Sequence, residues 1–168
     1  MRSRFVVVSV AVFVWLTDVT SKQWALRNLA DGHRVSLIGN FLTLHLTANP
    51  GAAFSIGTDH TWVFTALAAV VIGAIFLTSA RVTSGAWLLG LGGLAGGAAG
   101  NLTDRLVQPP QLGFGRVIDF IATPNFPVFN LADTAIVCSV ALMFIASALN
   151  VPLSVAPESP RHPRRPAS

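Results

Sequence analysis

Three long stretches of the sequence contain no charged side chain. Residues 61–80, 82–103 and 134–157 lack Asp, Glu, Lys and Arg and consist mostly of apolar residues. A helix needs about 20 predominantly apolar residues to cross the hydrocarbon core of a bilayer. Each stretch therefore predicts one membrane-spanning helix.

The composition agrees with a membrane protein. Of the 168 residues, 52% are hydrophobic and 11% are charged, whereas a soluble domain carries about 25% charged residues. The net charge is +4, but the basic residues show no stripe interleaved with aromatics, as a nucleic-acid surface would. We expect no nucleic-acid partner.

A fourth span is predicted at the start of the chain. The first apolar run follows Arg2 and Arg4 and is too short to cross a bilayer, as in a secretory signal peptide. No small-residue cleavage site follows it, so a helix over about residues 5–25 fits better. Asp18 and Lys22 lie near its far end, four residues apart with the acid first, and are expected to pair on one helical face. Such pairing lowers the cost of ionisable groups near the membrane.

The predicted fold is an all-α membrane protein with four transmembrane helices and a small β-structure on the outer side. Residues 1–150 form the helical domain, and residues 151–168 contain five prolines, which predicts a disordered tail. The expected spans are residues 5–25, 61–80, 84–106 and 131–150.

Four spans place both chain ends on one side of the membrane. That side carries Arg2, Arg4, Arg81 and three arginines of the tail, against five basic residues on the other side. All six Asp residues lie on the other side or near its interface. By the positive-inside rule, we expect both termini in the cytoplasm.

The two outer segments differ in their pattern. Residues 35–55 are rich in β-formers interrupted by Gly39-Asn40 and Asn49-Pro50-Gly51, which predicts a small sheet or flap at the outer interface. The second of these interruptions is also typical of a plain type II turn. Residues 108–129 contain four prolines, so a long regular helix is not expected there.

The third predicted span carries a run of glycines four or fewer residues apart. Small residues at this spacing let helix backbones approach closely in lipid. The run therefore predicts tight helix packing, which would also hold in place the polar residues just beyond it. Its members are Gly92, Gly93, Gly96, Gly97 and Gly100.

Polar side chains cluster where the predicted helices reach the outer side. Asn101, Asp104 and Arg105 follow the glycines on one helical face, and Asn130 and Asp133 open the last helix. Polar groups at membrane depth are costly and invite a functional hypothesis. Structural alternatives stay open: Asn130 suits an N-cap with Asp133 in the first turn, and Asp104 and Arg105 can form an interfacial ion pair.

Asp119 has the weakest structural explanation, because it is a lone carboxylate among Val, Ile and Phe. If Asp119 and Asp133 face each other, their like charges and apolar surroundings raise one pKa, so that the pair shares a proton. The ionised member can then deprotonate a water while the protonated member donates to a carbonyl oxygen. Such a pair titrates as a unit, which leaves the acid and the base unassigned.

Metal and cofactor chemistry is not indicated. The single cysteine, Cys138, makes no intrachain disulfide, and the four histidines lack the spacing of a metal-binding pair on one helix. We expect no metal and no cofactor.

Five short motifs follow one another across nearly the whole chain. Each alone is weak, but all five in this order are highly specific. They are Asp18-Val-Thr-Ser-Lys22, Asn49-Pro-Gly-Ala-Ala-Phe54, Gly100-Asn-Leu-Thr-Asp-Arg105, Val117-Ile-Asp-Phe-Ile121 and Phe129-Asn-Leu-Ala-Asp133. With these motifs the chain resembles the bacterial lipoprotein signal peptidases (signal peptidase II).

The resemblance implies an intramembrane aspartyl endopeptidase with four helices and an outer β-cradle. Such enzymes remove signal peptides from prolipoproteins by cleaving before a Cys that carries a diacylglyceryl group. It implies that Asp119 and Asp133 are the catalytic pair. Positions that line the site are Asn49, Asn101, Arg105 and Asn130, and positions with a mainly structural role are Asp18, Lys22, Gly51 and Asp104.

The resemblance also implies a multi-pass protein of the bacterial inner membrane with its site near the outer face. We expect contact with membrane lipid, sensitivity to the cyclic peptide globomycin and no obligate protein partner. Pro50 stands at the variable position of the Asn-x-Gly motif, and the Arg- and Pro-rich tail matches no motif of the family.

Two other functional classes compete with a peptidase. A small transporter or proton relay predicts polar residues spread through the spans, whereas the middles of the second and fourth spans carry no ionisable side chain. A structural or assembly protein accounts for the glycine faces but leaves Asp119 and Asn49 unexplained.

Overall fold

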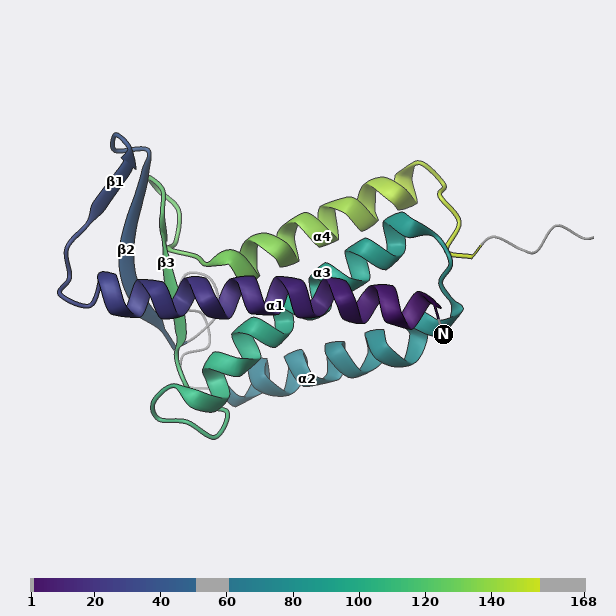
Figure 1. Cartoon of the computed structure of the whole chain (residues 1–168), viewed down its shortest axis with the longest axis horizontal. Coiled ribbons are helices and arrows are strands. Elements are labelled where there is room, and N and C mark those ends of the chain that lie inside the picture. Colours follow the sequence, from purple (N-terminus) through teal and green to yellow (C-terminus); the bar gives the residue numbers. More distant parts are fainter. Residues whose placement is uncertain (1, 51–60, 155–168) are drawn as a thin grey trace, which may run out of the picture.

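The computed structural model describes residues 2–50 and 61–154, which form four long helices and one small sheet (Figure 1). Each long helix overlaps one of the spans expected from the sequence. The helices are α1 (Arg2–Asn28), α2 (Thr61–Thr78), α3 (Gly85–Val107) and α4 (Leu131–Ala148), with a 3-10 turn η3 (Ser79–Arg81) after α2. The strands are β1 (Val35–Ile38), β2 (Leu42–Asn49) and β3 (Val117–Ala122).

Among the described residues, three helices are long and apolar enough to cross a membrane: Arg2–Asn28, Thr61–Arg81 and Leu131–Ala148. The remaining long helix, α3, has 23 residues, but its many glycines lower its hydropathy. It packs against α1, α2 and α4, so much of its surface faces protein. A helix enclosed in this way needs fewer large apolar side chains than one that faces lipid. That all four helices cross a membrane stays a prediction.

The glycines of α3 bring its backbone close to two neighbouring helices. A Cβ at Gly96 would lie 2.6 Å from the carbonyl oxygen of Ala11 in α1, and a Cβ at Gly97 would lie 2.6 Å from that of Ala132 in α4. Both distances are far below ordinary carbon–oxygen contact. The glycine run therefore acts in close helix packing, as its spacing predicts.

The three strands form an antiparallel sheet in the order β1-β2-β3. β1 and β2 make a hairpin whose turn contains Gly39 at a positive φ of 48°, a conformation that glycine adopts without steric cost. The sheet expected within residues 35–55 is thus present, and its last part, including Gly51, lies outside the described residues. The third strand was not expected from the sequence. It pairs with β2 so that Asp119 lies opposite Thr47.

The sheet lies across one end of the helical bundle, and the chain begins at the other end (Figure 1). A cluster of Ala25, Leu29 and Phe120 packs the last turns of α1 against β3. This end of the molecule, with the three strands and the adjoining helix ends, is called the sheet end below.

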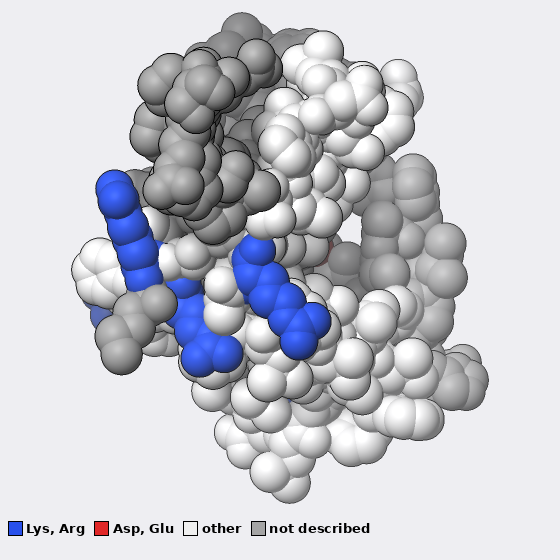
Figure 2. Space-filling view, turned by 90° about the vertical axis from the view of Figure 1, so that its right-hand side faces the viewer, with Lys and Arg blue, Asp and Glu red and all other residues white. Residues whose placement is uncertain are grey.

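The opposite end contains the first turn of α1 and η3, and with them Arg2, Arg4 and Arg81. Figure 2 looks onto this end, where basic side chains stand out on a described surface that is otherwise almost uncharged. Arg4 lies over the ring of Phe76, with its Cζ 5.3 Å from the ring centroid. We call this the arginine end. Its interior is an apolar cluster of Val7, Ile75, Val82, Leu88 and Ala95.

Candidate active site

Two carboxylates from separate elements meet at the sheet end. Asp119 comes from β3 and Asp133 from the first turn of α4. Asn130 contacts both: its Nδ2 donates to Asp119 Oδ1 at 2.6 Å, and its backbone N–H donates to Asp133 Oδ2 at 3.3 Å. Both acids line one cavity of about 500 Å³. The expectation that these two carboxylates lie together in space therefore agrees with the structure.

Asp119 lies in a nearly closed environment and is 2% exposed. Its other oxygen, Oδ2, accepts a hydrogen bond of 3.1 Å from Asn49 Nδ2. Burial, followed by the nearby charge of Asp133, raises the pKa of Asp119 from 3.8 to about 7, although the two amide donors act in the opposite direction. A carboxyl group in this range can hold a proton near neutral pH and release it again.

Asn130 combines a structural and a site role. It is the N-cap of α4: its Oδ1 accepts from the backbone N–H of Asp133 at 2.9 Å, and Asp133 returns a bond to the Asn130 backbone in a capping box. The N-cap interpretation is thus correct, but it is incomplete. The Nδ2 of the same side chain reaches Asp119 and the carbonyl oxygen of Ile118. One amide therefore fixes the start of α4 relative to β3.

Asn101 and Arg105 approach the acids from α3. Asn101 Nδ2 donates to Asp133 Oδ1 at 2.8 Å. Arg105 Nη1 donates to the carbonyl oxygen of Asn101 at 3.2 Å, and its guanidinium lies 5.8 Å from the ring centroid of Phe64 in α2. Both residues line the cavity, so α3 supplies polar groups to the same site.

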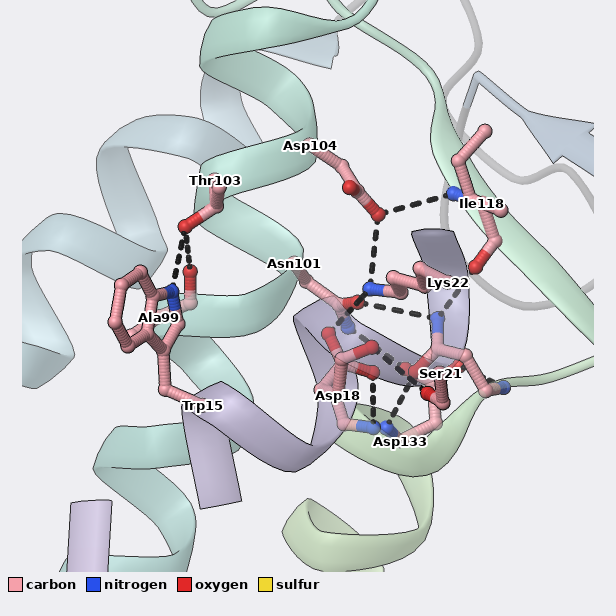
Figure 3. Close-up of polar contacts among 12 residues, drawn as sticks. Trp15, Asp18, Ser21, Lys22, Ala99, Asn101, Thr103, Asp104, Ile118 and Asp133 are labelled. Carbon is pink, nitrogen blue, oxygen red and sulfur yellow. Dashed lines mark hydrogen bonds and ion pairs between the residues drawn. The ribbon is translucent and has the colours of Figure 1, made fainter. Parts of the chain in front are cut away.

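A second polar cluster, of Asp18, Lys22 and Asp104, lies next to Asn101 and does not line the cavity (Figure 3). Lys22 Nζ lies 2.7 Å from Asp18 Oδ2 and 2.8 Å from Asp104 Oδ2. The pairing of Asp18 with Lys22 confirms the prediction from their spacing. Asp104 pairs with a lysine from another helix, a partner that the sequence did not suggest.

Each acid of this cluster also holds a backbone group of another element. Asp18 Oδ1 accepts from the N–H of Ala132 in α4 at 2.8 Å, and Asp104 Oδ2 accepts from the N–H of Ile118 in β3 at 3.1 Å. Ala132 and Ile118 are the direct neighbours of Asp133 and Asp119. The cluster therefore ties α1 and α3 to the two segments that carry the acids.

The cavity has polar groups at one side and apolar walls elsewhere. A second hollow of about 510 Å³ adjoins it and shares Asp119, Asn49 and Phe126 with it. Asp119 thus lies where the two hollows meet, whereas Asp133 lines only the first of them. The apolar wall residues include Phe126, Pro127, Val128, Phe129, Ile136 and Val137.

The wall segment was not identified from the sequence. In the sequence, Pro127 belongs to a segment with four prolines, Phe129 begins one of the five motifs, and Ile136 and Val137 lie within an expected span. Phe129 and the residues just before it are held against β3 by the bridge between Ile121 and Phe129, whereas Ile136 and Val137 follow Asp133 in α4. The sequence signal for this segment is the pair of aromatic residues three positions apart, Phe126 and Phe129. In the structure their rings pack edge to face, with centroids 5.8 Å apart.

The structure brings nearly all the expected site residues to one place. Gly51 is the exception, because it lies outside the described residues. Asn49, Asn101, Arg105, Asp119 and Asp133 line the cavity, and Asn130 is buried between the two acids. Asp18, Lys22 and Asp104 form the second polar cluster.

Comparison with known proteins places this arrangement in one family. The model of the family described as Signal peptidase (SPase) II matches residues 10–149. A lipoprotein signal peptidase of Leifsonia xyli is 44% identical over 137 residues, which cover 81% of this chain and 63% of the relative. One of Streptomyces griseus is 44% identical over 146 residues, which cover 87% and 74%. The chain thus spans less than two thirds of the Leifsonia relative.

Two solved structures of bacterial membrane enzymes have a similar fold. One superposes with a TM-score of 0.75 at 25% identity and covers 90% of this chain and 93% of its own. The other gives a TM-score of 0.72 at 27% identity and covers 84% and 91%. Together with the apolar helices, this likeness makes the protein a multi-pass membrane protein. From the family model and these relatives, the chain belongs to the signal peptidase II family, the lipoprotein signal peptidases.

Proposed function

We propose that this protein is an aspartyl endopeptidase that removes signal peptides from prolipoproteins. It cleaves before a Cys that carries a diacylglyceryl group and uses Asp119 and Asp133 as a catalytic pair. The observation that carries the proposal is the meeting of these two carboxylates, from β3 and α4, on one cavity and through one buried amide. Relatives named lipoprotein signal peptidases support the choice of substrate.

In the proposed reaction, the pair shares one proton. The ionised carboxylate takes a proton from a water, whose oxygen adds to the scissile carbonyl carbon, while the protonated carboxyl donates to the carbonyl oxygen. The proton taken from the water then passes to the leaving amine, and the C–N bond breaks as one hydroxyl of the intermediate returns its proton to the other carboxylate and the C=O bond re-forms. The raised pKa of Asp119 supports such sharing near neutral pH. Since the pair titrates as a unit, neither acid is assigned a single role.

The proposed placement follows from the two ends of the molecule. All four helices cross the bacterial inner membrane, with the arginine end and both termini in the cytoplasm. The sheet end then lies at the outer face, where a lipidated Cys would hold the scissile bond at the depth of the acids. The apolar wall of the cavity suits the apolar part of a signal peptide. A globomycin-type cyclic peptide should occupy the same cavity, and neither a cofactor nor an obligate protein partner is needed.

A gel-shift cleavage assay tests the proposal. Purified protein in detergent is incubated with a diacylglyceryl-modified prolipoprotein in the presence of a chelator. Asp119→Asn and Asp133→Asn are compared with Asp31→Asn, whose exposed carboxylate is hydrogen-bonded to the nearby His33. We expect cleavage by the wild type and by Asp31→Asn, and none by the two site variants.

The outcomes separate the parts of the proposal. Absence of cleavage by folded wild type overturns the peptidase assignment. Cleavage that disappears with the chelator contradicts the metal-independent aspartyl mechanism. Folding of each variant is checked by its elution as a single species and by its melting temperature (Tm).

A further inference from the structure

We propose that Lys22 is a positioning residue that orients the amide of Asn101 toward Asp133. The inference rests on the proposed function, because it assigns Lys22 a role in the reaction of that site. Lys22 is 2% exposed and is not among the residues that line the cavity. Apart from its charge, which favours the ionised form of Asp119, Lys22 can therefore act on the cavity only by holding a side chain that does line it, and Asn101 is such a side chain.

The donor and acceptor types determine the direction of the Asn101 amide. Lys22 Nζ lies 3.0 Å from Asn101 Oδ1, and an ammonium group only donates. Asn130 Nδ2 donates to the same oxygen at 3.2 Å. The other atom, Asn101 Nδ2, faces the carboxylate of Asp133 at 2.8 Å. A rotated amide would face two donors with its NH2 group and a carboxylate with its oxygen, so three favourable contacts would become repulsive.

The Asn130 amide is fixed by the same logic. Its Oδ1 accepts from the backbone N–H of Asp133, which is a donor only, and its Nδ2 must then point to Asp119. Lys22 and this backbone N–H are thus the two unambiguous donors that set both amides. As a result, each catalytic carboxylate receives an amide N–H.

The position of Lys22 is itself well determined. Its ammonium has three hydrogens, and it has three oxygen partners within 3.0 Å: Asp18, Asp104 and Asn101 (Figure 3). Since Asp18 and Asp104 also bind the backbones of Ala132 and Ile118, the ammonium is held relative to the segments that carry the acids. A lysine free to rotate could not set the amide in this way.

A double-mutant cycle tests the inference on the full-length protein. The kcat and KM for cleavage of the lipidated prolipoprotein are measured for Lys22→Met, Asn101→Ala and the combination. We expect kcat of Lys22→Met to fall about 100-fold, as for loss of one preorganised donor, with KM within about threefold. In the Asn101→Ala background, Lys22→Met should lower kcat by less than about threefold, because its target amide is already absent.

Two further variants keep the test decisive if Lys22→Met does not fold. Lys22→Gln retains an N–H donor for Asn101 and should recover at least about tenfold of the lost kcat. Asn101→Asp keeps an acceptor for Lys22 and nearly the same volume but has no N–H for Asp133, so it should be as slow as Asn101→Ala at an unchanged Tm.

The matched control is Trp15→Phe, which removes the 2.9 Å hydrogen bond from Trp15 Nε1 to Thr103 Oγ1 between the same two helices (Figure 3). It should keep kcat within about threefold. An equal fall in kcat for Lys22→Met in both backgrounds, or full activity of Asn101→Asp, overturns the inference while leaving the peptidase function intact. An inactive wild type would instead overturn the proposed function itself.

Discussion

The two ends of the helical bundle have interiors built from different kinds of side chain. At the arginine end, Val7, Ile75, Val82, Leu88 and Ala95 pack without a charged group among them. At the sheet end, the interior contains every buried charged side chain of the described residues: Asp18, Lys22, Asp104, Arg105 and Asp119.

The difference shows where this fold tolerates costly groups. Buried charges are unfavourable unless they are paired and hydrogen-bonded, and at the sheet end the acids and Lys22 have charged, amide or backbone partners. Small residues and apolar contacts hold the rest of the bundle, as is usual where lipid removes the hydrophobic drive between helices. We therefore expect substitutions at the sheet end to act on catalysis and those at the arginine end to act on stability.

Outside the two acids themselves, the largest effect should come from Asn130→Asp. Aspartate retains the N-cap acceptor for Asp133 but cannot donate to Asp119, so the helix start should survive while the site fails. We expect the cleavage rate to fall at least about 1000-fold, within the range of lost acid–base catalysis. Tm should change by only a few degrees. If the variant keeps its activity, Asn130 acts only as the N-cap of α4 and its hydrogen bond to Asp119 is not needed for cleavage.

Gly100→Ala should have the next largest effect. A Cβ there would lie 2.4 Å from Asp18 Oδ2 and would displace the carboxylate that holds Ala132. Such overpacking costs about 2 kcal/mol, and we expect a lower Tm together with a cleavage rate reduced about tenfold. Gly73→Ala is the control, because a Cβ at Gly73 meets no atom within 4 Å. Equal behaviour of the two variants would show that the Asp18 carboxylate does not need this space.

The pH profile should shift in Asn49→Ala. Since the pKa of Asp119 is about 7, the pair loses its shared proton and cleavage slows as pH rises through 7. The hydrogen bond from Asn49 favours the ionised form of Asp119, so its removal raises this pKa further. The descending limb should move to higher pH by about half a unit or more. Asn28→Ala removes a hydrogen bond from an exposed amide to the Trp24 carbonyl oxygen and should keep the wild-type profile. An unshifted profile of Asn49→Ala would contradict the assignment.

The smallest effect on catalysis should come from Leu88→Ala at the arginine end. Leu88 is 7% exposed within the apolar cluster, whereas the adjacent Leu89 is 51% exposed. We expect Leu88→Ala to lower stability by about 2 kcal/mol and to leave kcat of the folded protein within about threefold. Leu89→Ala should change neither quantity. A large loss of kcat in Leu88→Ala would break the division between the two ends.

Much of this architecture could be predicted because it depends on local pattern. The apolar stretches determine where the long helices lie, since helix formation and lipid exposure act on consecutive residues. The turn at Gly39 and the cap at Asn130 also depend on a few neighbouring residues. The sequence also indicates Asp119 as a site residue, because no local structural role explains a lone carboxylate among Val, Ile and Phe.

Other features could not be predicted from local pattern. The segment Val117–Ala122 is apolar, but so are many other segments of this chain, so its sequence does not mark it as a strand. It forms a strand because it pairs with β2. Hydropathy also does not reveal that α3 lies at the centre of the bundle, because its glycines give it only a weakly apolar character. Its central position is evident only from its packing against α1, α2 and α4.

By itself, the sequence determined a helical membrane protein, its hairpin turn, the pairing of Asp18 with Lys22 and the choice of two acids. Only the tertiary structure decided that Lys22 also binds Asp104 and Asn101, and that Asn130 bridges the acids. The reason is the separation along the sequence between the residues that interact. The first set arises from residues a few positions apart, whereas Lys22 and Asn101 are separated by 79 positions and Asp18 and Ala132 by 114. Which distant donor meets which acceptor is settled by the packing of helices, and glycine spacing limits that packing without specifying it.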